Sequence, residues 1–234
     1  MNDQVKLNFF ASTPEPCGYL ENRKAISAFA NPHIDMNMDI YDDLIQHGFR
    51  RSGSHVYRPH CPSCQECISV RVLVKKYNYS RNEKRYFRLN RDLEVKTVGS
   101  RFKAEHFDLY RRYVNARHSE GSMANPTKAD YHRFLISEWT ETIFLEFRLN
   151  KVLIAVAVTD VLNSSLSPVY TFFDPDYNSR SLGHYAILKQ IEEAQSREHD
   201  YVYLGYWIKD CQKMSYKRRY RPMEAFIHDQ WVTL

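Results

Sequence analysis

Hydrophobic and polar positions follow two different periods after residue 92, and each period predicts one kind of element. Residues 93–98 alternate between apolar and polar side chains, which is typical of a strand with one buried face. Phe107, Tyr110 and Val114 recur at helical spacing and predict a helix over 104–117. By the same reasoning the chain continues with a helix from Thr127 to about 139, strands at 143–149, 152–160 and 169–173, a helix at 182–197, a strand at 201–204, a short helix, and a strand at 224–229.

The part of the chain before about residue 80 has weaker periodicity, and we expect it to be largely irregular. Residues 39–47 predict a short helix with Asn37 or Asp39 as its cap and Gly48 as its end. Residues 70–74 predict a strand, and Ser80 opens a charged helix that runs to about Arg91. The whole order predicts an α+β protein with a mixed sheet.

The composition indicates a folded protein, because 43% of the 234 residues are hydrophobic and 14% are aromatic. This length suits one large domain or two smaller ones. The N-terminus lacks a basic segment followed by an apolar stretch, so we expect no signal peptide. The longest apolar run, 152–158, is far shorter than the ~20 residues that cross a bilayer. With five cysteines and no export signal, we expect a cytoplasmic protein with reduced thiols.

The net charge of +5 is modest, but the cations gather in two clusters that also hold aromatic residues. The first comprises Arg71, Lys75, Lys76, Arg81, Lys84, Arg85, Arg88 and Arg91 with Tyr77, Tyr79, Tyr86 and Phe87. The second comprises Lys209, Lys213, Lys217, Arg218, Arg219 and Arg221 with Tyr206, Trp207, Tyr216 and Tyr220. Cations neutralise phosphates and aromatic rings stack on unpaired bases, so both clusters suit an RNA end. The alternative is a solvated surface whose aromatic rings point inward.

Three cysteines, Cys61, Cys64 and Cys67, stand at C-x2-C-x2-C spacing, which lets three thiolates converge on one point. With Cys17 they would complete a four-thiolate zinc site or hold an iron–sulfur cluster. The alternative is a set of reduced thiols that pack a loop. Cys211 has no partner in the sequence and is expected to be a plain thiol.

The element order over residues 92–234 resembles that of the GNAT acyltransferases. In that fold the turn into the helix at 182–197 holds the pyrophosphate of acetyl-CoA through a Gln/Arg-x-x-Gly-x-Gly/Ala pattern. Here the turn reads Arg180-Ser-Leu-Gly183-His184-Tyr185. We expect the ring of Tyr185 to crowd a pyrophosphate, so the half-match supports the fold and argues against CoA.

Further motifs extend the likeness to nearly the whole chain. They are Cys17-Gly-Tyr-Leu20, Tyr57-Arg-Pro-His-Cys61-Pro-Ser-Cys64-Gln-Glu-Cys67 with Arg71, Ser80-Arg81, Arg117-His118 leading to Met123, Tyr203-Leu-Gly205-Tyr-Trp-Ile208, Met214-Ser-Tyr-Lys217 and Tyr220-Arg-Pro222. Together these motifs resemble those of the bacterial aminoacyl-tRNA–protein transferases, relatives of the eukaryotic arginyl-tRNA–protein transferases. The eukaryotic members are longer and carry a second cysteine where this chain has Leu20, which weakens any transfer of their metal or cluster chemistry.

This resemblance implies two domains: a cysteine-containing acceptor-recognition domain at 1–91 and a GNAT-like transferase domain at 92–234. It implies an aminoacyltransferase that moves leucine from Leu-tRNA to the N-terminal amine of proteins beginning with Asp or Glu, which marks them for degradation. Three alternatives stay open: an arginyl-tRNA–protein transferase, a CoA-dependent N-acetyltransferase, and a non-catalytic RNA-binding protein with a structural zinc site.

The chemistry implied by this resemblance needs no cofactor, because an aminoacyl ester is already activated and a neutral amine attacks it directly. Backbone N–H groups near Phe173 are our candidates for stabilising the oxyanion. His118 and His184 are candidates for a base or a substrate contact, although most lone histidines are neither. Asp174, beside Pro175, is either a turn former or a functional carboxylate.

Recognition of an acidic acceptor needs a fixed cation, and Arg binds a carboxylate with two parallel hydrogen bonds. We expect Arg71, then Arg81, to supply it; a surface salt bridge is the alternative for each. For the tRNA end we expect cations and stacking rings from the second cluster: Lys213, Lys217, Arg218, Arg221, Tyr206, Trp207 and Tyr216.

Overall fold

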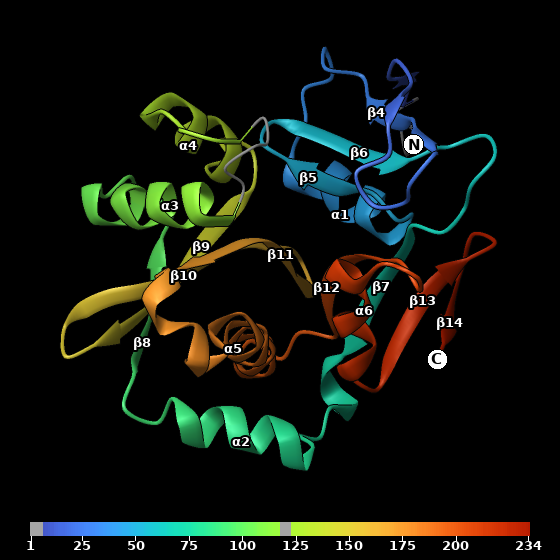
Figure 1. The fold of residues 1–234 in the computed structure, drawn as a ribbon. Coiled ribbons are helices and arrows are strands. Elements are labelled where there is room, and N and C mark those ends of the chain that lie inside the picture. The colour runs from blue at the N-terminus through green and yellow to red at the C-terminus, as the bar shows by residue number, and fades with distance from the viewer. Residues whose placement is uncertain (1–6, 118–122) are drawn as a thin grey trace.

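An eight-stranded mixed sheet forms the centre of the computed structural model, which describes residues 7–117 and 123–234 (Figure 1). In spatial order its strands are β14 (Gln230–Thr233), β13 (Met223–Ile227), β7 (Ile68–Leu73), β12 (Tyr201–Trp207), β11 (Ser165–Phe173), β10 (Val152–Val161), β9 (Glu141–Leu149) and β8 (Glu94–Gly99). All neighbouring pairs are antiparallel except β11 and β12, which are parallel. The prediction of an α+β protein with a mixed sheet is confirmed.

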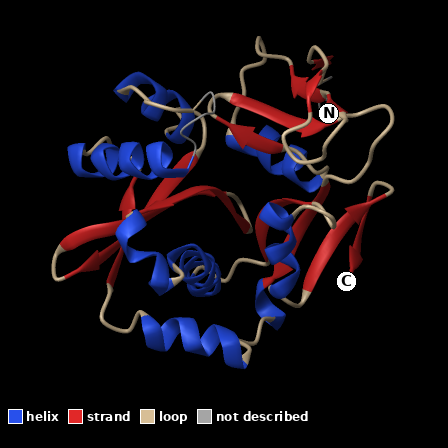
Figure 2. Ribbon diagram, viewed as in Figure 1, coloured by secondary structure: helices blue, strands red, loops and turns tan. Residues whose placement is uncertain are grey.

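Helices cover both faces of this sheet (Figure 2). On one face α5 (Leu182–Ser196) packs against a core that includes Val70 and Ala155, with α2 (Arg81–Leu89) outside it. On the other face α3 (Ala104–Arg117) and α4 (Lys128–Leu135) share a core with Val156. Because alternate residues of β10 face opposite sides, this strand is buried along almost its whole length.

The N-terminal part of the chain is more regular than its sequence predicted. It forms a four-stranded sheet in the order β1 (Phe9–Ala11), β4 (Ser27–Ala30), β6 (His55–Pro59) and β5 (Arg50–Ser52), and a hairpin of β2 (Glu15–Pro16) and β3 (Lys24–Ala25). The helix α1 (Met38–Gln46) packs beside this sheet. The expectation of an irregular segment was wrong because these strands are two to five residues long and most of their side chains are exposed or half-buried.

One early strand belongs to the large sheet. Strand β7 pairs with β12 on one side and with β13 on the other, so a teal strand lies beside the red C-terminal strand in Figure 1. The division at residue 91 stays a prediction. Any boundary there leaves β7 in the sheet of the second part, so the two parts share a core.

Most local signals gave the right elements. Asn37 caps α1 by accepting from the Ile40 N–H, and Ser80 forms a capping box with Glu83 at the start of α2. Asn150 and Lys151 turn between β9 and β10 with φ values of 48° and 70°. The helix predicted to about residue 139 ends at Leu135, and β14 was not predicted.

Short helical turns complete the fold. They are η1 (Val74–Lys76), η2 (Pro175–Arg180), α6 (Gln212–Ser215) and η3 (Tyr216–Arg219). No helix between residues 7 and 117 or between 123 and 234 has the length and apolar character needed to cross a membrane.

A buried ion pair joins the N-terminal sheet to the large one. Arg51 on β5 donates two hydrogen bonds of 2.7 Å to the Asp160 carboxylate on β10, and both side chains are fully buried. Thr142 donates to the same carboxylate at 2.8 Å. The small and large sheets are therefore fixed to each other by charge as well as by packing.

We expect Asp160→Asn to lower the free energy of unfolding by about 3–5 kcal/mol, because it leaves the Arg51 guanidinium buried without its counter-charge. Urea denaturation followed by circular dichroism measures this, with the exposed Asp176→Asn as the control. Equal stability of the two variants would show that the pair is not needed to hold the sheets together.

Candidate active site at the diverging strands

The parallel strands β11 and β12 separate soon after they begin. Only Ser165 with Tyr201 and Leu166 with Val202 are paired, whereas β11 continues to Phe173 and β12 to Trp207. Backbone groups on the inner edges of two separated strands have no ladder partner and must bond to something else.

Arg50, from the N-terminal sheet, bridges the two strands. Its guanidinium donates to the Tyr203 carbonyl on β12 at 2.7 Å and to the Pro168 carbonyl on β11. The residue is only 7% exposed, and no carboxylate among residues 7–117 and 123–234 pairs with it. Its neighbour Arg51 has Asp160, so the two adjacent arginines differ in having a counter-charge.

Lys217 brings a second buried amine to the same place. It is 6% exposed, and its ammonium donates to the Tyr206 carbonyl. Burial, and after it the positive charge of Arg50, lowers the pKa of Lys217 to about 7. A Cβ at Gly205 would lie 3.6 Å from Arg50 Nε and 3.7 Å from Lys217 Nζ, so the backbone bulge at this glycine, with φ +78°, sits against both cations.

The backbone of β11 presents a donor toward the separation. Asp174 N–H donates to the Ile154 carbonyl at 2.8 Å, which makes these two residues a hydrogen-bonded pair. Hydrogen-bonded and non-hydrogen-bonded pairs alternate along an antiparallel ladder, so the next pair, Phe173 with Ala155, is not hydrogen-bonded. The Phe173 N–H therefore points away from β10, toward the space between β11 and β12. This orientation is compatible with the predicted oxyanion contact at Phe173, while the N–H of Asp174 is already used.

The carboxylate of Asp174 is held by its own surroundings. It accepts from Arg112 at 2.8 Å and from the Asp176 N–H at 3.1 Å, and the residue is 6% exposed. It caps the turn η2. The turn-former reading of Asp174 therefore matches its geometry, and its pairing with Arg112 leaves it poorly placed as a base.

His184 lies in the first turn of α5, which packs against Phe173 through Gly183. Its Nδ1 is 2.7 Å from the Tyr220 hydroxyl, and its ring stacks on Tyr86 with an interplanar angle of 2°. Burial, followed by the charge of Arg219, lowers the pKa of His184, so the imidazole is neutral near neutral pH. Tyr220 therefore supplies the group that orients the ring, a partner that the sequence did not reveal.

The arginines predicted to bind the acceptor lie elsewhere. Arg71 is buried on β7, 2.8 Å from Glu224, with its guanidinium 3.7 Å from the centre of the Tyr201 ring and 4.1 Å from that of Trp231. Arg81 is exposed at the start of α2. The placement of Arg71 argues against a substrate contact, because its charge is already neutralised.

The residues predicted for the tRNA end divide by exposure. Tyr206 is buried and its hydroxyl donates to the carbonyls of Gly48 and Tyr57, so it is not available for stacking. Lys217 is also buried. The remaining members are exposed (Lys213, Arg218, Arg221) or half-buried (Trp207, Tyr216). His118 lies outside the described residues.

The expected obstruction by Tyr185 is not present. Its ring is buried against Phe87 and Phe147, on the core side of α5. Arg180, in the same motif, forms two hydrogen bonds of 2.8 and 2.9 Å to Asp92. The argument against CoA from the bulk of Tyr185 is therefore wrong, because a helix directs this side chain inward.

The four N-terminal cysteines do not have the geometry of a zinc site. No three of their sulfur atoms lie within 4.8 Å of one another, whereas thiolates on one zinc ion are about 3.8 Å apart. The Cys64 sulfur accepts a hydrogen bond of 3.1 Å from the Arg23 guanidinium. Burial, and then the neighbouring thiols, raise the pKa of Cys67 to about 12, which favours the neutral thiol.

One other group in the described chain has metal-ligand chemistry: Glu105, His106 and Glu146. Glu146 already accepts from Lys103, His106 and Arg148. Two cations on one carboxylate repel a third, so this group is a structural charge network.

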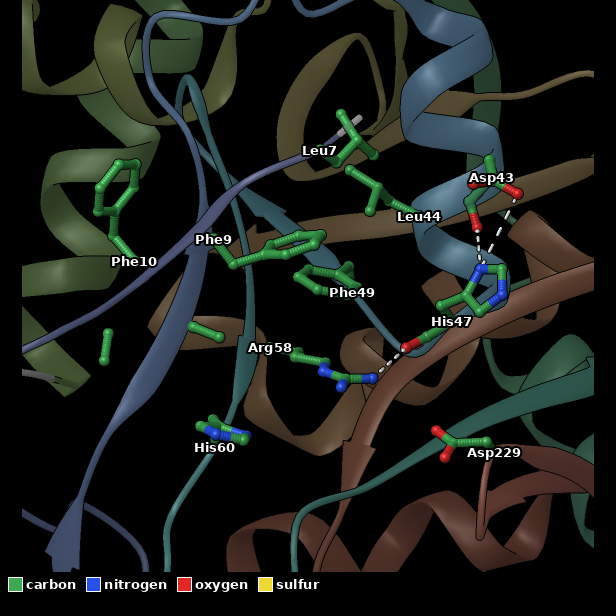
Figure 3. A pocket seen from close by; sticks show the side chains of 12 residues that line it. Leu7, Phe9, Phe10, Asp43, Leu44, His47, Phe49, Arg58, His60 and Asp229 are labelled. Atoms are coloured by element: carbon green, nitrogen blue, oxygen red, sulfur yellow. Dashed lines mark hydrogen bonds and ion pairs between the residues drawn. The ribbon is translucent and has the colours of Figure 1, made fainter. Parts of the chain in front are cut away.

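A pocket of 590 Å³ lies on the N-terminal sheet (Figure 3). Apolar side chains such as Phe9, Leu44 and Phe49 form much of its wall, and Arg58 donates to the His47 carbonyl at its rim. None of the predicted site residues that the structure describes lines it.

Comparison with known proteins settles the family. The sequence model described as "Arginine-tRNA-protein transferase, N terminus" matches residues 15–85, and that described as "Arginine-tRNA-protein transferase, C terminus" matches residues 105–227. This chain belongs to the arginine-tRNA-protein transferase family.

Full-length relatives refine the family assignment. The chain is 49% identical over 234 residues to a protein of Saccharophagus degradans (strain 2-40), covering all of this chain and 99% of the relative. It is 45% identical to a protein of Hahella chejuensis and 47% identical to one of Pseudomonas fluorescens (strain Pf0-1), both over the full length of both chains. All three relatives are named aspartate/glutamate leucyltransferase.

Likeness to solved structures is weaker. FemX aligns with 82% of this chain and 65% of its own, at 10% identity and a TM-score of 0.49. A likeness of this size identifies neither a fold family nor an activity.

Sequence reasoning missed Arg50, Arg112 and Tyr220 as parts of this site. Arg50 and Arg51 are adjacent and chemically identical, and only the alternation of a strand sends them to different partners. Tyr220 belongs to the Tyr220-Arg-Pro222 motif, but its partner His184 is 36 residues away. No local signal marks either contact.

We expect the free energy of unfolding of the wild type to rise with pH between about pH 7 and about pH 9, relative to that of the Lys217→Met variant. The unfolded chain holds the Lys217 proton up to its ordinary pKa of 10.5, whereas the folded chain releases it near 7. The unfolded state therefore binds more protons in this window, and the slope reaches up to about 1.4 kcal/mol per pH unit. Urea denaturation at several pH values measures it.

The exposed Lys213→Met serves as the matched control, and we expect it to follow the wild type at every pH. Parallel profiles for the wild type and Lys217→Met would mean that the buried amine keeps its ordinary pKa.

Proposed function

We propose that this protein transfers leucine from Leu-tRNA to the N-terminal amine of proteins that begin with Asp or Glu, and so marks them for degradation. The observation that carries the proposal is the full-length match, at 45–49% identity, to relatives named aspartate/glutamate leucyltransferase. The buried Arg50 and Lys217 beside the diverging strands, together with His184 at the start of α5, support this proposal. We propose the cytoplasm as its location, because charged tRNA is found there.

The donor side lies at the first turn of α5. The ester carbonyl of the aminoacyl-tRNA lies beside β11. Its oxygen accepts a hydrogen bond from the Phe173 N–H as negative charge develops on it. The amine attacks, a carbon–nitrogen bond forms, and the ester bond to the ribose breaks. The ribose oxygen takes up a proton as it leaves, and the attacking nitrogen loses one.

His184 is the group we propose for this proton exchange. When its Nδ1–H donates to the Tyr220 oxygen, Nε2 carries the lone pair that accepts a proton from the amine. Its lowered pKa keeps the imidazole neutral and ready to accept. Placing the two substrates together supplies much of the remaining acceleration.

The acceptor side lies at Arg50. Two of the five N–H groups of its guanidinium bond to strand carbonyls, which leaves others for a ligand. In the described part of the chain no carboxylate pairs with the Arg50 guanidinium or with Lys217, which is partly protonated near pH 7, so positive charge is locally in excess. The side chain of an N-terminal Asp or Glu supplies the missing negative charge, so we propose Arg50 in the role first expected of Arg71, with Lys217 adding to the field.

The arrangement of strands supports a GNAT-like reading of the second part of the chain. The antiparallel β9, β10 and β11, followed by the crossover α5 and a parallel β12 that diverges, form the order expected from the sequence. We retain the cysteine-containing first part as the acceptor-recognition region, because it contributes Arg50.

We expect labelled leucine to pass from Leu-tRNA to peptides beginning with Asp or Glu and not to those beginning with Ala or Lys. A fixed cation attracts a carboxylate and repels an ammonium group. Scintillation counting of the peptides measures the transfer, with Arg-tRNA and acetyl-CoA as parallel donors. Transfer from Arg-tRNA alone would favour an arginyltransferase, and transfer from acetyl-CoA alone would overturn the use of tRNA.

We expect Arg50→Gln to lower kcat/KM for an Asp peptide about 10- to 100-fold relative to the matching Asn peptide, which is the loss of one charged hydrogen bond. Arg71→Gln is the matched control, a second buried arginine whose charge is already neutralised by Glu224, and it should keep the wild-type ratio. The ratio separates recognition from stability, because a purely structural role of Arg50 would lower kcat/KM equally for both peptides. That equal loss, or a changed ratio in Arg71→Gln alone, would remove Arg50 from the acceptor site.

A further inference from the structure

A row of cations runs along the outer face of α2. Within Arg81–Leu89 and just beyond it, residues 81, 84, 85, 88 and 91 are arginine or lysine, and all five side chains are exposed. Their spacing of three or four residues places them on one side of the helix, about 5–6 Å apart. The row is about 15 Å long.

The acidic groups near this row are occupied. Glu83, the one acidic residue of α2, is buried and accepts from the Tyr77 hydroxyl at 2.6 Å and the Ser80 N–H at 2.7 Å. Asp92 is paired with Arg180. In the described part of the chain none of the five cations has an ion-pair partner, so their charges remain available.

The aromatic residues of α2 point the other way. Tyr86 stacks on His184, and Phe87 contacts Tyr185 on α5. The exposed face therefore offers charge without a stacking surface. Such a face fits a phosphate backbone and does not fit unpaired bases.

The path from this row leads to the active site. Asn90 donates to the Arg180 carbonyl at 3.0 Å, just before α5, and Tyr79 donates to Gln195 near the other end of α5 at 3.1 Å. The two helices therefore cross, with the end of α2 near the start of α5 and with α2 on the side of α5 away from the sheet (Figure 1). The end of α2 that carries Arg88 lies beside the helix start that carries His184.

From this juxtaposition, and resting on the proposed function, we infer that α2 binds the phosphate backbone of the double-stranded acceptor stem of the tRNA. The unpaired 3′ end then continues past the start of α5 to the diverging strands. The contact is independent of base sequence, because phosphates are the same in every tRNA.

The test compares Arg85→Glu/Arg88→Glu with Arg101→Glu/Lys128→Glu, a control that changes the same number of exposed cations outside α2. All four sites are on the surface, so thermal unfolding should match the wild type. Fluorescence anisotropy with an unacylated leucine-accepting tRNA, and with an acceptor-stem minihelix, is recorded between about 50 and 200 mM salt.

We expect the α2 variant to bind both RNAs more than tenfold more weakly, with the slope of log K against log salt reduced by about 1.5 to 2. The KM for an Asp peptide, measured at saturating Leu-tRNA, should not change. Binding of the control variant should stay within about twofold of the wild type, because its cations lie outside the contact.

Equal weakening of the two variants would reduce the effect to net charge and overturn the role of α2. Wild-type affinity in the α2 variant would overturn it as well. A wild-type protein that binds no tRNA would instead refute the proposed function, so the two failures are distinguishable.

Discussion

The contact on which the site depends is the bridge from one guanidinium to two strands that no longer pair. Strands β11 and β12 part after Leu166 and Val202, and their inner carbonyls would otherwise be buried without donors. Arg50 donates to one carbonyl on each strand, which keeps the separation open and fills its inner end with positive charge. The geometry of the sheet and the electrostatics of the site therefore have the same cause.

This bridge also ties the two parts of the chain together. Arg50 comes from the small N-terminal sheet, while the strands it holds belong to the large one. Arg51 makes a second link through Asp160, and β7 makes a third by pairing within the large sheet. On the proposed function, a first part that binds the acceptor and a second part that binds the donor are held at a fixed distance by these links, which is what a reaction driven by positioning requires.

The pattern of neutralised and unpaired cations separates structural charges from functional ones. Arg51, Arg71 and Arg148 each have carboxylate partners and serve the fold. Within residues 7–117 and 123–234, Arg50 and Lys217 are buried without a carboxylate partner, and the cations of α2 are exposed without one. A protein that must hold an acidic peptide head and a polyanionic RNA needs positive charge that its own carboxylates have not neutralised.

Sequence alone determined the elements with strong local signals: the capped helices α1 and α2, the β9–β10 turn, the mixed sheet and the family resemblance. It named His184 and Phe173 as candidates, because a strand end and a helix start are adjacent along the chain, and their roles stay a prediction. It did not find the short N-terminal strands, nor that Arg71 and Lys217 are buried. The tertiary structure alone decided that Arg50 and not Arg71 stands at the separation, that Tyr185 turns inward, and that Tyr220 meets His184. These contacts join residues 36 to 153 positions apart, and no local pattern of side chains carries information over that distance.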